Sequence, residues 1–149
     1  MTRRLSREER GFTLIELLIV ILVIGILAAI ALPAFLGQRE SAQDADAKSN
    51  ARNLVSYMDS CYTRENDFRD CSTQADADAN DVDWGSAPGQ VSVTNTAKDS
   101  YEIVAISKSA DGGGSNHSFT IARSIAGGMT RTCTAGGSGD GGGCKNGTW

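Results

Sequence analysis

The residues of this sequence that could form covalent bonds with one another are its four cysteines. They lie in two local pairs, Cys61 with Cys71 and Cys133 with Cys144. Zinc sites usually place paired cysteines two to four residues apart, and neither pair has this spacing. Four cysteines allow three disulfide connectivities, and the local one is favoured because short loops close at low entropic cost. The pattern therefore predicts disulfides rather than a zinc site.

A polar segment, "DADANDVDWG" at residues 76–85, could in principle bind a hard cation. Its carboxylates are Asp76, Asp78, Asp81 and Asp83. A twelve-residue calcium loop starting at the first of them needs glycine at its sixth position and glutamate at its twelfth, where Asp81 and Ala87 stand. We expect a solvated acidic loop, keep the four aspartates as weak calcium candidates, and expect no metal or cofactor.

Catalytic chemistry has little support in this sequence. The one histidine, His117, lies in a stretch rich in glycine and serine that is expected to be a loop. Ser115 and Ser118 flank it, but no nucleophile and base stand at a recognisable spacing. The glycine-rich stretches do not follow a strand and open a helix, as a phosphate-binding loop would. The sequence therefore predicts that this protein is not an enzyme.

The longest element that the sequence predicts is an apolar helix near the N-terminus. Residues 12–32 contain one charged side chain, Glu16, and as a helix of 21 residues they would span ~31 Å, about one hydrocarbon core. Four arginines and two glutamates precede the helix. Because positive flanks stay in the cytoplasm, the rest of the chain is expected outside the membrane.

The charge of the chain argues against nucleic acid as a partner. The whole sequence has a formal net charge of −4. Without the two excess positive charges of its first eleven residues, the remainder carries −6. An acidic body does not attract phosphate backbones, so we expect no direct contact with nucleic acid.

An amphipathic pattern follows the apolar run. Apolar residues recur there at spacings of three and four: Ala47, Ala51, Leu54, Val55, Met58, Cys61 and Tyr62. This is one face of a helix, and Asp44 is assigned to the opposite, polar face. Residues 13–62 are thus predicted to form one helix of ~75 Å, with Pro33 as a point of bending. Its apolar first half should protrude, and its second half should pack on the rest of the chain.

The C-terminal part is predicted to form strands at residues 101–107, 118–125 and 129–133, and weakly at 90–94. No helix-length crossover lies between them, so the sheet should be antiparallel. The pair Gly127-Gly128 is placed as a two-residue hairpin connection. The expected fold class is α+β, with the second half of the helix packed on a small antiparallel sheet. Trp149 is either exposed or docked on this sheet.

The stretch "RGFTLIELLIVILVIGILAAIALPAF", residues 10–35, resembles the N-terminus of type IV pilins and type II secretion pseudopilins nearly residue for residue. An ordinary secretory signal has a shorter apolar stretch. The resemblance implies a pilin fold and a leader that a prepilin peptidase removes after Gly11. It also implies N-methylation of the new terminus, Phe12, and retention of the apolar helix in the product.

The resemblance assigns a role to Glu16. In a filament of staggered helices, its carboxylate would face the N-terminal amine of Phe12 in a neighbouring subunit. A subunit at the wrong height would leave both charges unpaired in apolar surroundings, so the pairing would set the axial register. Gly25 and Pro33 bracket a stretch that filaments of this family often show locally unwound. Cys133 and Cys144 would delimit a C-terminal loop, whereas a Cys61–Cys71 bridge is not carried over from the family.

The expected organisation is a cleaved leader at residues 1–11, an apolar membrane and filament-core helix at 12–36, and a head at 37–149. Within the head we expect the amphipathic helix at 37–62, an acidic loop at 63–100, and the sheet with its disulfide loop at 101–149.

These expectations describe the precursor of a type IV pilus subunit. It would wait in the inner membrane with its head outside and then assemble into an extracellular homo-oligomeric filament. The resemblance implies an assembly platform and a motor ATPase as further partners. The alternatives are a pseudopilin of a type II secretion or DNA-uptake system and a monomeric membrane-anchored binding domain.

Overall fold

A computed structural model of the chain describes residues 11–72, 82–110, 114–135 and 142–149. The chain divides into two compact units, residues 1–37 and 38–149. One long helix, α1 (Leu14–Glu65), contributes its first part to the first unit and its remainder to the second. This agrees with the helix predicted over residues 13–62.

The first unit contains the apolar part of α1. The large apolar side chains described between Phe12 and Leu36 are exposed. By length and composition alone, α1 is the one described helix apolar enough to cross a membrane. The helix continues through Gly25 and Pro33. Proline has no amide hydrogen to donate, so one carbonyl in the preceding turn lacks its usual helical partner.

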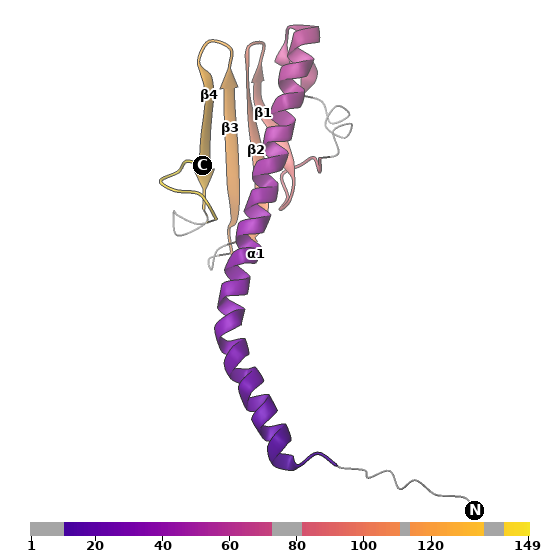
Figure 1. Ribbon diagram of the computed structural model, residues 1–149. Helices are drawn as coiled ribbons and strands as arrows, with labels where there is room; N and C mark the ends of the chain where they lie inside the picture. The colour runs from indigo at the N-terminus through magenta and orange to yellow at the C-terminus, as the bar shows by residue number, and fades with distance from the viewer. Residues whose placement is uncertain (1–10, 73–81, 111–113, 136–141) are drawn as a thin grey trace, which may run out of the picture. The chain divides into compact units, whose positions relative to one another are not determined.

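The second unit is built around an antiparallel sheet. Its strands are β1 (Val91–Ala97), β2 (Ser100–Ala110), β3 (Asn116–Ser124) and β4 (Gly128–Thr134). They lie in the order β1-β2-β3-β4, and each pairs with its neighbour in sequence (Figure 1). This confirms the predicted α+β class. The weakly predicted strand, β1, is present within the stretch otherwise expected to be an acidic loop.

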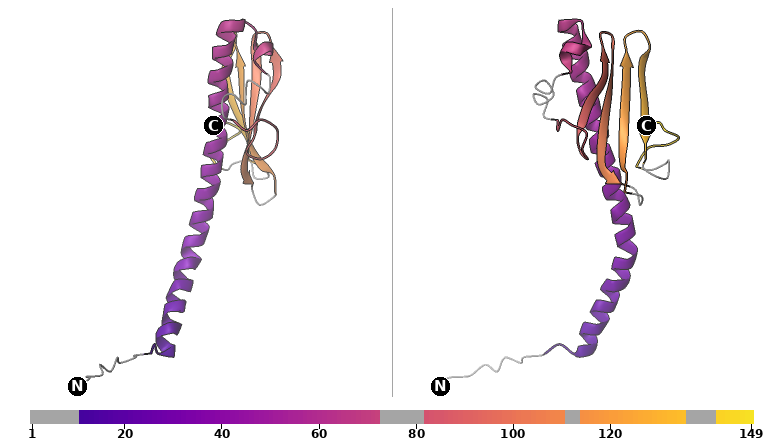
Figure 2. Two further views of the ribbon diagram at one scale, coloured as in Figure 1. Left: turned by 90° about the vertical axis from the view of Figure 1, so that its right-hand side faces the viewer. Right: turned by 180° about the vertical axis from the view of Figure 1, so that it is seen from behind.

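Within this second unit, the remainder of α1 covers one face of the sheet (Figure 2). The apolar stripe of the helix is buried, with Ala51, Leu54 and Met58 at most 1% exposed. It packs on alternate side chains of the strands, such as Ile103 and Ile121, because successive residues of a strand point to opposite faces. These two apolar surfaces are buried against each other, and their removal from water forms and stabilises the core of the head.

The turn between β3 and β4 differs from the sequence prediction, and β1 contains an irregularity. Ser124 pairs with Gly128, so three residues, Ile125 to Gly127, connect β3 to β4 instead of the two-residue Gly127-Gly128 turn. Asn95 lies inside β1, where its φ of 49° coincides with a register shift in the pairing with β2. A bulge that absorbs one irregular residue explains how β1 continues past it.

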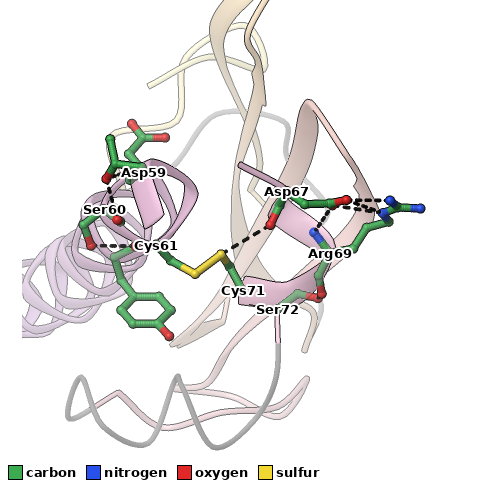
Figure 3. The surroundings of a disulfide bond; sticks show 9 residues. Asp59, Ser60, Cys61, Asp67, Arg69, Cys71 and Ser72 are labelled. Atoms are coloured by element: carbon green, nitrogen blue, oxygen red, sulfur yellow. Dashed lines mark hydrogen bonds and ion pairs between the residues drawn. A yellow bond between two sulfur atoms is a disulfide. The ribbon is translucent and has the colours of Figure 1, made fainter. Parts of the chain in front are cut away.

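The C-terminal end of α1 is tied to the short 3-10 helix η1 (Phe68–Cys71) by a disulfide between Cys61 and Cys71 (Figure 3). Asp67 caps η1 by accepting the backbone N–H of Arg69, and it also pairs with the Arg69 guanidinium. Hydrogen bonding from Arg69 lowers the pKa of Asp67 to about 2. The bridge and the cap together hold the turn that reverses the chain after α1.

A second disulfide joins Cys133 of β4 to Cys144, with 5.7 Å between their Cα atoms. The chain beyond it returns to the sheet, since the Cys133 N–H donates to the Gly147 carbonyl at 2.9 Å. The Trp149 indole packs edge-on against Phe119 and donates its Nε1–H to the Thr132 carbonyl. Trp149 therefore docks on the head, which decides the alternative that the sequence left open.

Candidate assembly site

The residues before α1 form a short non-helical segment. Gly11, Phe12 and Thr13 have no regular secondary structure, and Phe12 is 87% exposed. The peptide bond between Gly11 and Phe12 therefore lies outside the helix, where its amide and carbonyl are not part of the helical ladder. The bond expected to be cleaved thus lies in exposed, irregular backbone, and cleavage there stays a prediction.

Glu16 and Thr13 form a reciprocal cap at the start of α1. The Thr13 backbone N–H and side-chain hydroxyl each donate to Glu16 Oε2 at 2.8 Å, and the Glu16 N–H donates to the Thr13 hydroxyl at 3.3 Å. This is a capping box, in which two otherwise unpaired backbone donors are satisfied by side chains. The sequence analysis missed it, although threonine followed three residues later by glutamate before an apolar run is its known signal.

The cap also sets where the carboxylate can act. Glu16 is exposed, and the hydrogen bonds that its carboxylate is described as accepting all use Oε2. Oε1 is left to accept a donor from another molecule. The cap holds the carboxylate beside the first turn of α1, where the aligned peptide dipoles favour a negative charge. Glu16 is thus both the N-terminal cap of the helix and a positioned acceptor.

Gly25 and Pro33, predicted to bracket a stretch that melts on assembly, both lie in regular helix here. Gly25 also lines a shallow apolar hollow on the first unit together with Leu18, Leu22 and Ala29. Its missing side chain creates this hollow, which suits close approach of another helix. Unwinding between Gly25 and Pro33 stays a prediction.

The acidic segment does not form a site within the described chain. Asp83 is exposed, and Asp76, Asp78 and Asp81 lie outside the described residues. Among the residues that the structure describes, no three histidine, cysteine or acidic side chains are grouped so as to hold a metal ion. Calcium binding by this segment stays an expectation without structural argument.

A buried polar cluster in the head was missed by the sequence analysis. His117 was assigned to a loop, but it lies in β3 and is 4% exposed. Asp44 was assigned to the polar face of the helix, but it is fully buried and its Oδ2 lies 2.9 Å from His117 Nδ1. The signal was present, because Asp44 precedes Ala47 and Ala51 at spacings of three and seven and so falls on the buried stripe.

The cluster has the residue types of a hydrolytic triad but not its geometry. The Ser109 hydroxyl lies 3.3 Å from His117 Nδ1, the same nitrogen that contacts Asp44. A relay needs the serine and the carboxylate on opposite ring nitrogens, so that the carboxylate orients the ring while the other nitrogen takes the proton. Sharing one nitrogen prevents this relay. The cluster joins α1 to β2 and β3 and is structural.

Gly142, two residues before Cys144, lies against this cluster. Gly142, with a φ of +55°, lies so near that an added Cβ would stand 1.3 Å from Asp44 Oδ2. Lys48 Nζ donates to the Gly142 carbonyl at 3.0 Å and lies over the Phe119 ring. Burial lowers the pKa of Lys48, and the nearby Asp44 carboxylate partly opposes this effect. The N-terminal part of the head's helix thus holds the end of the C-terminal loop.

Comparison with known proteins places these features in context. A family model described as "Prokaryotic N-terminal methylation motif" matches residues 6–32. The chain is 36% identical over 125 residues to the type IV narrow pilus major component PilA5 of Thermus thermophilus, covering 84% of this chain and 94% of that protein. It is 38% identical over 71 residues to the type IV major pilin protein PilA of Myxococcus xanthus.

A further relative comes from a secretion system. The chain is 38% identical over 55 residues to the type II secretion system core protein G of Dickeya chrysanthemi. The matched regions span about a third of that protein and of the Myxococcus pilin, 36% and 32% of their lengths. In both, they cover less than half of the present chain.

An exposed apolar helix with a capped start, and a small antiparallel sheet covered by the remainder of the same helix, define a class of α+β proteins with an apolar N-terminal helix. Among these, the match over nearly the full length of a pilus component is decisive. The chain belongs to the type IV pilin family.

Proposed function

We propose that this protein is the structural subunit of a type IV pilus. It is made as a prepilin, cleaved after Gly11, N-methylated at Phe12, and polymerised through α1. The observation that carries the proposal is the capped Glu16 in the first turn of an apolar helix, together with the exposure of the large apolar side chains from Phe12 to Leu36. Exposing such a large apolar surface to water is unfavourable, so lipid or neighbouring copies of the same helix would cover it.

Assembly then follows from the charges at the start of α1. Cleavage creates an amine at Phe12, four residues before Glu16. In the subunit itself the cap occupies Oε2, so the amine of a neighbouring subunit can approach Oε1. In an apolar filament core this pairing would fix the position of each subunit along the filament axis, because any other position would leave a buried charge unpaired. Moving the helix from lipid to the core gains little hydrophobic energy, so pairing, packing and a motor drive extrusion.

The precursor resides in the inner membrane with its head outside, and the filament is extracellular. The partners are a prepilin peptidase, an assembly platform and a motor ATPase, together with other copies of this chain. A pseudopilin is the second candidate, favoured by the similarity to the secretion core protein G of Dickeya chrysanthemi. The match to the narrow pilus component favours the pilus, since it extends through the head.

The test is Glu16→Ala, with Glu40→Ala as a matched control on the exposed part of the same helix. We expect surface-sheared filaments of Glu16→Ala to fall at least about tenfold, since leaving one partner of a buried pair costs ~3–5 kcal/mol. Mass spectrometry should still find a methylated chain starting at Phe12 in the membrane. Glu40→Ala should assemble normally. Abundant normal filaments from Glu16→Ala would contradict the proposed register.

A further inference from the structure

One face of the sheet is turned away from α1 (Figure 2). An open groove lies on this face, and polar and apolar residues both line it. The register sets Glu102, Ala122 and Thr130 side by side in one row across β2, β3 and β4. Ser100, Ser124 and Gly128 form the adjacent row. Successive side chains alternate between faces, and Tyr101, Ile103 and Ile121 are buried under α1, so both rows face away from the helix.

The groove is produced by a difference in side-chain size along these rows. Ala122, Ser124 and Gly128 are small and form a low floor at the end of β3 and the start of β4. Glu102 stands higher on one side and Thr130 on the other. The groove is open to solvent and has a volume of about 300 Å3, at the lower end of the range of small-molecule sites.

An irregularity in β1 aims a further polar group into the groove. By strict alternation Asn95 would share the core-facing side of β1 with Val93. The bulge after Thr94 turns it round, and its side-chain amide donates to Glu102 Oε2. Asn95 has a φ of 49°, a strained conformation that tends to be kept where a side chain must point in a particular direction.

The electrostatics of the groove select its ligand. Among the described residues Glu102 forms no ion pair, because the ion pairs described there join other carboxylates. Arg123 lines the groove, but its Nε is directed at Asp59 at 3.5 Å. Glu102 therefore places a negative charge on the outer face of the groove, which disfavours phosphates and carboxylates there. Tyr101 and Arg123 also line the groove, but they pair with each other in the row on the helix side of the sheet. The polar side chains on the outer face are one carboxylate and one amide, with the hydroxyls of Ser100, Ser124 and Thr130.

We propose that this groove binds a neutral saccharide of one or two rings. Adjacent ring hydroxyls would donate to the free oxygen of Glu102, forming charge-assisted hydrogen bonds. The serine and threonine hydroxyls act as both donors and acceptors, which matches the mixed character of sugar hydroxyls. The C–H face of the ring would lie on Ala122. The site is open, so one subunit binds weakly, with a dissociation constant of ~1 mM or above.

Binding by one chain does not rest on the proposed pilus function. The avidity of the filament does rest on that function, because a filament would repeat the groove at every subunit and raise the effective affinity for a surface bearing many sugars. The experiment therefore uses the full chain in detergent micelles without a sugar headgroup. Lactose, cellobiose and chitobiose serve as probes in saturation-transfer NMR, with sialyllactose as the anionic comparison.

We expect saturation transfer to at least one neutral disaccharide and weaker transfer to sialyllactose. Ala122→Tyr fills the groove and should abolish the signal, and Glu102→Gln should reduce affinity about tenfold. Ser118→Tyr, on the same face of β3 but outside the groove, should bind as the unchanged chain does. Absence of transfer to all three probes, persistence in Ala122→Tyr, or preference for sialyllactose would overturn the proposal.

Discussion

At the scale of single residues, the buried pair of Asp44 and His117 is the feature that constrains the head most. Asp44 Oδ1 is buried and has no hydrogen-bond partner among the described residues, whereas Oδ2 contacts His117. A half-satisfied buried carboxylate is costly and depends on its surroundings for compensation. The loop glycine that closes over the pair keeps this region packed, since no side chain would fit there.

Gly142→Ala should therefore unfold the head more easily than Gly114→Ala. Both glycines have positive φ, +55° and +78°, so either alanine carries a backbone strain of ~1–2 kcal/mol. At Gly114 the added Cβ meets nothing within 4 Å, but at Gly142 it collides with Asp44. Urea unfolding of the detergent-solubilised chain should show Gly142→Ala as less stable than Gly114→Ala by at least ~1 kcal/mol. Equal losses would mean that the loop does not pack on Asp44 in solution.

At the scale of elements, the two parts of α1 differ in their surroundings. In the first unit its side chains, apart from Glu16, are apolar on every face, so the sequence does not favour burial of one face over another. In the second unit, apolar residues at spacings of three and four select the face that meets the sheet. The capping box at Thr13 and Glu16 determines where the helix begins, before either environment does so.

Thr13→Ala should fray the first turn of α1 and destabilise it by ~1 kcal/mol, because the Glu16 N–H loses its side-chain acceptor. Thr13→Ser keeps a hydroxyl and should behave like the unchanged chain. Amide hydrogen exchange of the micelle-bound protein would report this as about fivefold faster exchange near residues 14–17. If Thr13→Ala and Thr13→Ser exchange alike, the cap is not formed in the membrane.

At the scale of the whole molecule, two disulfides secure the ends of the head. Both are buried, with their cysteines at most 9% exposed. Each closes a short loop, which restricts the unfolded chain and stabilises the fold by ~2–3 kcal/mol. Cys61–Cys71 reverses the chain after α1, and Cys133–Cys144 brings the C-terminal residues back to the sheet edge.

Removing the two bridges separately should have different local effects. Cys133→Ser with Cys144→Ser should lower the melting temperature and release Trp149, since its contacts with Thr132 and Phe119 depend on the returning chain. Cys61→Ser with Cys71→Ser should also lower the melting temperature, but Trp149 should stay docked on the sheet. Acrylamide quenching in a Trp84→Phe background isolates the Trp149 signal. Equal quenching in both variants would show that Trp149 docks independently of the bridge.

Much of this molecule was predictable because the signals are local. The apolar run, the stripe from Ala47 to Met58, and the alternating strands each place a pattern within a few turns or residues, so the α+β class followed. The extent of α1 and three of the four strands agree with the prediction, and the fourth was weakly indicated. The N-terminal motif needed only its own residues to indicate the pilin family.

The sequence by itself thus determined the helix, the strands and the family of this protein. Only the tertiary structure decided that Asp44 is buried against His117, that Trp149 docks on β3 and β4, and that Asn95 turns toward Glu102. Asp44 and His117 are 73 residues apart. No local pattern encodes such a contact, because its free energy appears only when the helix and sheet are packed and water is excluded between them.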